Sequence, residues 1–106
     1  MTKKESKESL QVEIDKLIHE PARLKILAQL YVVESADFLF IMRQTGLTQG
    51  NVSGHLSKLE DAGYVKIEKG FIGKRPLTII SLTKKGRERF NKYVTTMHNI
   101  LDNLDG

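Results

Sequence analysis

The sequence has 106 residues, 40% of them hydrophobic and 28% charged, which is enough for one domain with a single core. It contains no cysteine, and this excludes disulfides, thiolate metal sites and cysteine catalysis. No long apolar run follows the basic first residues, so we expect no secretory signal, no membrane span and a cytoplasmic location.

The net charge of +4 is unevenly distributed along the chain. Residues 66–92 include nine Lys and Arg and only two Glu, whereas the rest of the chain has a net charge of −3. An uneven distribution of this kind favours a surface that binds a polyanion. On charge alone, a solvated charged face is an equally good interpretation.

Apolar spacing and capping residues predict four helices, which follow a flexible tail at 1–8. We expect a helix from Ser9 to the residue before Pro21, one from Pro21 to about Val33, one from about Ala36 to Gln44 with Ser35 as its cap, and one from Thr48 to about Ala62. Gly63 would end the fourth helix in the left-handed conformation. The second helix should be buried around most of its circumference, Ala28 included, and Phe40 of the third should point away from the core.

After Gly63 the apolar period changes from 3.6 to 2, which is typical of strands. We expect a strand over Tyr64–Lys69, a turn over 70–76 and a returning strand over Leu77–Leu82. Thr83 would then cap a long last helix. The expected order is α-α-α-α-β-β-α, a mainly α chain with a small β-hairpin.

The third and fourth helices, joined by a tight turn at Gly46, have the form of a helix-turn-helix. One face of the fourth helix is apolar. The opposite face is small and polar, with Gly50, Asn51, Ser53, Gly54, Ser57 and Lys58. A solvated helix would avoid two glycines, each of which costs about 1 kcal/mol. Asn and Gln can bond adenine edges, and a helix N-terminus can bind phosphate. We interpret this face as a DNA-reading surface; packing of the small face against another protein is the alternative.

The predicted hairpin turn has basic residues at its tip. Arg75 is suited to a narrow minor groove, and Lys69 and Lys74 are suited to phosphates. Taken alone, the turn would be an ordinary basic surface loop. Two further residues have open interpretations: His55 is either a partly buried histidine or a DNA contact, and Arg23 either contacts phosphate or braces the fold.

Residues 47–53 and 55–65 together resemble the recognition helix of small winged helix-turn-helix transcriptional regulators of bacteria and archaea, with the MarR and ArsR groups nearest. Residues 20–27 resemble the first helix of that domain, 73–76 its wing, and 82–87 the start of the following helix. The resemblance covers about residues 17–95. It implies a winged helix-turn-helix DNA-binding domain at 9–83 and a dimerisation helix at 84–106 within the same compact unit.

By this resemblance and the pattern together, the recognition helix at about 48–62 lies in the major groove and the wing at about 69–76 lies on the minor groove or backbone. The predicted DNA-binding residues are Thr48, Gln49, Gly50, Asn51, Ser53, His55, Ser57, Lys58, Lys69, Lys74 and Arg75. The last helix also carries a heptad seam, which is either monomer core or dimer interface. The predicted dimer interface is Leu10, Ile14, Leu17, Phe90, Val94, Met97, Leu101 and Leu104.

We therefore expect a homodimeric regulator of double-stranded DNA, by resemblance a repressor, on a near-palindromic site. We expect no enzyme, cofactor or metal; His98 and Asp102 stand one helical turn apart, but two ligands are too few for a zinc site. Any effector, of unknown identity, would bind at the dimer interface. The alternatives are a protein–protein interaction module, supported by the outward Phe40, and a non-specific architectural DNA binder.

Overall fold

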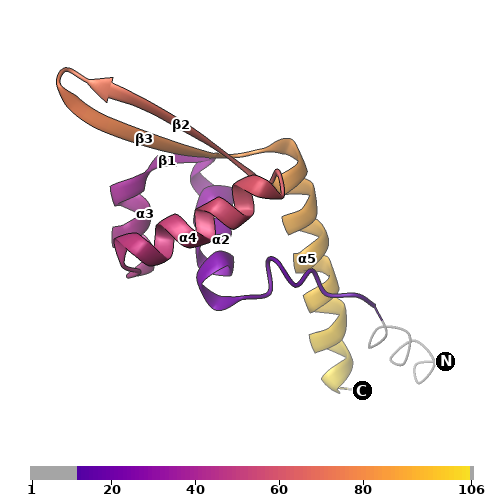
Figure 1. Ribbon diagram of the computed structural model, residues 1–106. Helices are drawn as coiled ribbons and strands as arrows, with labels where there is room; N and C mark the ends of the chain where they lie inside the picture. The colour runs from indigo at the N-terminus through magenta and orange to yellow at the C-terminus, as the bar shows by residue number, and fades with distance from the viewer. Residues whose placement is uncertain (1–11, 106) are drawn as a thin grey trace.

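Seven helices and strands and one short 3₁₀ turn make up the described part of the chain, residues 12–105 of a computed structural model (Figure 1). The helices are α2 (Pro21–Val33), α3 (Phe38–Thr45), α4 (Gln49–Asp61) and α5 (Lys84–Asp102), and the strands are β1 (Ser35–Asp37), β2 (Val65–Ile72) and β3 (Arg75–Leu82). The 3₁₀ turn η1 (Asn103–Asp105) follows α5. This is a winged helix fold, so the predicted fold class is confirmed.

Local capping signals define the helix-turn-helix. Thr48 caps α4 by accepting a hydrogen bond from the Asn51 amide at 3.2 Å. Gly46, after α3, and Gly63, after α4, both have positive φ, where a side chain would be strained. Thr83 caps α5 through the Gly86 amide at 2.9 Å. The predicted caps of α4 and α5 and the predicted end of α4 are therefore confirmed.

The core lies where α2, α3, α4 and the sheet meet. Its fully buried side chains come from these four elements and from the segment before α2: Ile18, Ile26, Leu27, Leu30, Ile41, Val52, Leu59 and Ile80. In α2, Ala22, Ile26, Leu27 and Leu30 are buried, and Leu24 and Tyr31 are partly buried against the same core. Ala28 and Val33 are exposed, contrary to the prediction. Apart from Val33 at the helix end, however, the exposed residues Pro21, Lys25, Ala28 and Val32 form one narrow strip, so α2 is buried or half-buried around most of its circumference. The helices α3 and α4 and the strands β1 and β3 pack against α2 and leave only this strip in solvent.

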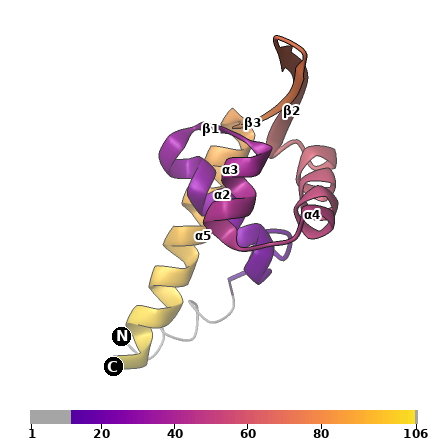
Figure 2. The ribbon, with the colours of Figure 1, turned by 90° about the vertical axis from the view of Figure 1, so that its left-hand side faces the viewer.

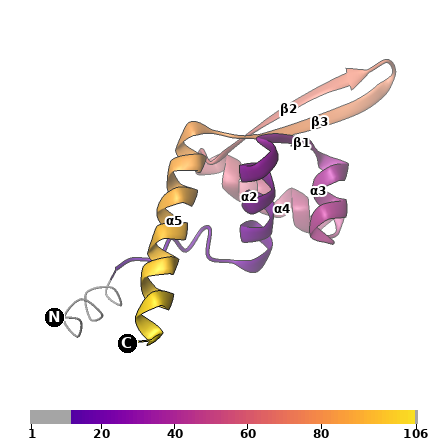
Figure 3. The ribbon, with the colours of Figure 1, turned by 180° about the vertical axis from the view of Figure 1, so that it is seen from behind.

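The predicted first helix does not form over residues 12–20, which run as an irregular segment between α5 and α2 (Figure 3). One Asp15 carboxylate oxygen accepts hydrogen bonds from the Leu17 and Ile18 amides at 2.9 and 3.2 Å. Such side-chain bonds compete with helical backbone bonds and favour a turn. The tail at 1–8, the cap Ser9 and Leu10 lie outside the described residues.

The start of the third predicted helix is also wrong. Residues Ser35–Asp37 form β1, which pairs antiparallel with β3 in the sheet order β1-β3-β2. Asp37, and not Ser35, caps α3, because its carboxylate accepts from the Phe40 amide at 2.8 Å. Phe40 itself is half-buried, and the exposed apolar residue of α3 is Leu39.

The hairpin is longer than predicted. Residues 70–72 were expected in the turn but continue β2, paired with residues 75–77 of β3. Only Gly73 and Lys74 form the turn, and Gly73 has a φ of 63°. The hairpin therefore projects beyond α3, away from the helical body (Figure 1).

Candidate nucleic-acid interface

The outer face of α4 is exposed and small. Every predicted DNA-reading residue of α4 and its cap, apart from His55, is exposed: Thr48, Gln49, Gly50, Asn51, Ser53, Ser57 and Lys58. A methyl group added to Gly50 or Gly54 would meet no atom within 4 Å. Since neither glycine is required by packing or by backbone conformation, folding alone gives no reason for them. The face offers amide and hydroxyl groups at its N-terminal end and a lysine at its C-terminal end.

The wing supplies the positive charge. Lys69, Lys74 and Arg75 are exposed, and none of them forms an ion pair with another residue of the described part of the chain. Lys66, nearer the body, pairs with Glu68 at 3.3 Å, which neutralises the root of the wing. Within the wing, the unpaired charge therefore lies toward the tip, where a polyanion can reach it.

The wing tip and α4 lie on one side of the molecule, and the C-terminal half of α5 extends on the other side (Figure 2). A single ligand surface can therefore contact α4 and the wing together without touching the end of α5. The segregation also matches the charge distribution, because the last residues of α5 contain no Lys or Arg after Lys92.

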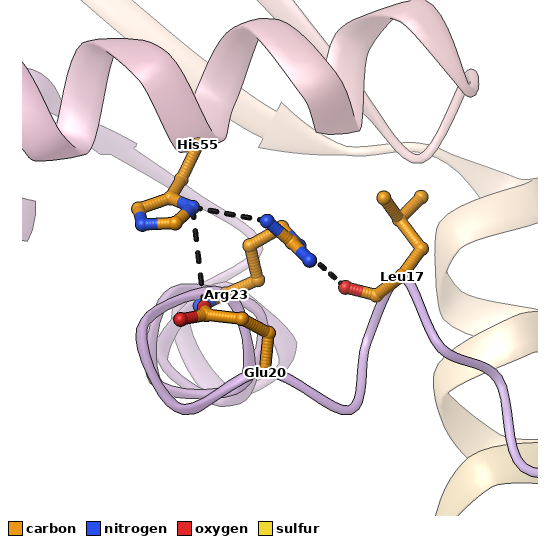
Figure 4. A network of polar contacts seen from close by, with 4 residues as sticks. All are labelled: Leu17, Glu20, Arg23 and His55. Carbon is orange, nitrogen blue, oxygen red and sulfur yellow. Dashed lines mark hydrogen bonds and ion pairs between the residues drawn. The ribbon is translucent and has the colours of Figure 1, made fainter.

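His55 and Arg23 belong to an internal network beneath α4 (Figure 4). Arg23 donates through Nε to the Leu17 carbonyl at 2.6 Å and through Nη1 to His55 Nδ1 at 3.2 Å. The carboxylate of Glu20 caps α2 and lies 3.9 Å from His55 Nδ1. The hydrogen bond that the Glu20 carboxylate accepts from the Arg23 backbone amide lowers the pKa of Glu20. Arg23 therefore braces α2 against α4, and Nδ1 of His55 is already engaged inside the chain.

A second network joins the irregular segment to the root of the wing and to α5. Tyr64 donates to the Asp15 carboxylate at 2.6 Å and accepts from Arg89 Nη1 at 3.4 Å. Burial, together with this bond to Asp15, raises the pKa of Tyr64. These residues line a cavity of about 380 Å³ between residues 13–16 and α5. Sequence reasoning missed this contact, because it placed Asp15 in a helix.

The predicted dimer residues divide into two groups. Phe90 is buried in the core of its own chain, with its ring centroid 5.3 Å from that of Tyr31. Ile14, Leu17 and Met97 are partly buried against the same core. Val94, Leu101 and Leu104 are exposed on α5 and η1, Leu104 to 74%. Phe90 is thus committed to the monomer, and the outer part of the seam remains uncovered.

Two further features of the described residues concern metal ligands and helix length. Within residues 12–105, no three His, Cys, Asp or Glu side chains lie close enough together to hold an ion, and His98 and Asp102 are both exposed. Over the same range, every helix is too short or too polar to cross a bilayer.

A helix-turn-helix followed by a β-hairpin defines the class of winged-helix proteins. Residues 22–101 match the family described as winged helix DNA-binding domain, and the chain belongs to this family. The predicted resemblance to winged helix-turn-helix regulators is thereby confirmed.

Two relatives match nearly the whole chain. An uncharacterized protein of Methanocaldococcus jannaschii is 38% identical over 90 residues, covering 85% of this chain and 98% of that protein. The solved structure of a transcriptional regulator homologue protein from Pyrococcus horikoshii OT3 is 31% identical with a TM-score of 0.82, covering 97% of this chain and 99% of that one.

A MarR family transcriptional regulator from Silicibacter pomeroyi shares the fold, with 20% identity and a TM-score of 0.66, over 97% of this chain and 68% of that one. The matched family is a DNA-binding domain, and the Pyrococcus horikoshii protein is described as a transcriptional regulator homologue. The chain is therefore a winged-helix DNA-binding protein, and over nearly its whole length it is similar to a transcriptional regulator homologue.

Proposed function

We propose that this protein is a sequence-specific regulator that represses transcription by binding, as a homodimer, to a near-palindromic double-stranded site. The observation that carries the proposal is the outer face of α4, which is exposed, lined with amides and hydroxyls, and free of packing constraints. Non-specific binders need mainly Lys and Arg on such a face, whereas this one has a single lysine. Because the proposed target is genomic DNA, the proposed compartment is the cytoplasm.

The proposed roles follow from chemistry and exposure. Gln49, Asn51 and Ser53 read base edges in the major groove, since their side chains both donate and accept hydrogen bonds. The cationic contacts to the DNA backbone and flanking minor groove come from Lys58, Lys69, Lys74 and Arg75. Thr48, Gly50 and Ser57 complete the surface; His55 reaches DNA only with Nε2, because Nδ1 is bonded to Arg23.

Four cations per protomer set the expected salt dependence. In a dimer they would neutralise roughly eight phosphates, and each neutralised phosphate contributes about −0.9 to the slope of log K against log salt. We therefore expect a slope of about −7 for the dimer.

The second copy of the chain is proposed to cover the outer seam of α5 and η1. Val94, Leu101 and Leu104 are exposed there, and Met97 lies half-buried in the same heptad series. A two-fold dimer through this seam keeps both copies of α4 on the far side. Their separation would be about 34 Å, one turn of DNA, which explains the expected palindrome.

The test is selection of binding sites from a genomic DNA pool, followed by fluorescence anisotropy across a salt series. Asn51→Ala should relax the sequence choice, and Arg75→Ala, which removes one cation from each protomer, should weaken binding to every sequence and reduce the salt slope of the dimer by about two. Lys25→Ala removes an exposed charge on α2 and is the matched control. If the wild type selects no reproducible sequence, the specific-regulator proposal is wrong. Weak binding that is insensitive to salt would then indicate a protein-interaction module, and strong binding an architectural one.

A further inference from the structure

The wing tip carries large apolar side chains that its own fold does not bury. Phe71 is 72% exposed and Ile72 is 61% exposed, and Pro76 beside them is also exposed. Neither Phe71 nor Ile72 packs against the core cluster of the chain. Because exposed apolar area costs free energy in water, two such neighbours at the end of a projecting hairpin indicate a surface that a binding partner covers.

The strand register places these side chains on both faces of the ribbon. Phe71 is paired with Pro76, and Ile72 with Arg75, immediately before the turn at Gly73 and Lys74. Cross-strand partners lie on the same face, and successive residues lie on opposite faces. One face of the tip therefore presents Phe71 and Pro76, and the other presents Ile72 beside the Arg75 guanidinium. The tip is a thin apolar wedge with charge at its edge.

The charges around the wedge indicate which kind of partner covers it. Lys69, Lys74 and Arg75 surround it, all exposed and outside any ion pair within residues 12–105. From Lys69 to Arg87 the sequence contains no Asp or Glu. An apolar protein partner gains nothing from this cationic rim, whereas a nucleic acid supplies phosphates for the rim and base faces for the wedge.

The dimensions of the wing tip are compatible with the minor groove of DNA. The two strands of a ribbon are about 4.8 Å apart, and the minor groove is about 6 Å wide and about 7.5 Å deep. Only the side chains at the tip can enter such a groove. The ribbon itself would stay outside, where its lysines face the phosphates.

We propose that Phe71, supported by Ile72, enters the minor groove beside the site read by α4 and partly unstacks one base step, which bends the DNA. This inference rests on the proposed function, in which the wing lies on the minor groove. It makes Phe71 a specificity residue that forms no hydrogen bond to a base. Pyrimidine–purine steps unstack most easily, so TA or CA steps should be selected at the flanking position.

The test uses the DNA selected by the wild-type protein, with 2-aminopurine at the flanking step and a donor and acceptor dye at the two ends. Wild-type binding should raise 2-aminopurine fluorescence and shorten the end-to-end distance. Phe71→Ala should abolish both signals and lower affinity roughly tenfold, with an unchanged salt slope because no charge is removed. Phe71→Leu should keep most of the bend.

Leu39→Ala, which removes an equally apolar and 58% exposed side chain from α3, is the matched control and should change neither signal. If Phe71→Ala binds the selected DNA with its bend and fluorescence intact, the wedge is refuted and the proposed function stands. If the wild type selects no DNA, both fail. If Phe71→Ala instead dissociates the DNA-free dimer in sedimentation, the tip is a contact between copies and the wedge is refuted.

Discussion

Replacing Gly54 with alanine should stabilise the protein and weaken its DNA binding at the same time. Gly54 lies inside α4, is exposed, and has open space where a Cβ would stand. Glycine in a helix interior costs about 1 kcal/mol relative to alanine, so Gly54→Ala should raise the free energy of unfolding by about 0.5–1 kcal/mol. For a domain of this size, that gain raises Tm by about 2–4 °C. The new methyl group would hold α4 away from the DNA.

Gly86 gives the opposite expectation from the same substitution. It is buried in the first turn of α5, where an added Cβ would overlap the Tyr64 carbonyl oxygen and lie 2.9 Å from Leu82 Cδ1. Overpacking of this kind costs about 1–3 kcal/mol, which outweighs the helix-propensity gain of about 1 kcal/mol. Gly86→Ala should therefore lower the free energy of unfolding.

Urea denaturation followed by circular dichroism measures both effects, and anisotropy measures affinity for the selected DNA. We expect Gly54→Ala to raise the free energy of unfolding and Gly86→Ala to lower it. Of the two variants, only Gly54→Ala should bind the selected DNA more weakly while remaining folded. A Gly54→Ala protein that is no more stable than the wild type would refute the argument that this glycine is unneeded for folding. Unchanged DNA affinity would refute the close approach of α4.

Three other outcomes are expected. Arg23→Lys, which loses the bond to His55, should lower the free energy of unfolding by about 1–2 kcal/mol in urea denaturation, yet leave DNA affinity within twofold if Arg23 only braces the fold. Because the pKa of Tyr64 is raised in the fold, the contribution of its neutral hydroxyl to stability should be complete below pH ~10 and lost as the pH rises further. Tyr64→Phe should reduce this fall in the free energy of unfolding, as measured by urea denaturation between about pH 8 and 11. Leu101→Asp with Leu104→Asp should produce a monomer in sedimentation equilibrium, with the far-ultraviolet spectrum unchanged.

The elements that sequence reasoning predicted well depend on neighbouring residues. The cap of α4 at Thr48 joins atoms three residues apart, and the stop at Gly63 needs only a positive φ. The exposure of the recognition face also follows from the helical period once the core side is identified. Most of the candidate DNA surface could therefore be anticipated before any fold was known.

The parts that were missed depend on residues distant in sequence. β1 exists because Ser35–Asp37 find β3 more than forty residues later, and no periodicity can appear in three residues. The apolar spacing before Pro21 was helical, but Asp15 bonds to Tyr64 across 49 residues and holds the segment in another conformation. His55 could not be assigned for the same reason, since its partner Arg23 lies on a different helix.

Apart from the exposed seam of α5, which we assign to the dimer, two departures from local folding rules lie on the same side of this molecule. Gly50 and Gly54 lie within α4 where no packing requires a glycine, and Phe71 and Ile72 are exposed to solvent at the end of the hairpin. Each feature lowers stability, and each lies on the side shared by α4 and the wing (Figure 2). Single exposed residues such as Val32 are common on any protein surface and need no such explanation. Two independent features that lower stability on one surface are instead expected of a binding face. Small residues on α4 allow the helix to approach the DNA closely, and the apolar wing tip would be covered by base faces.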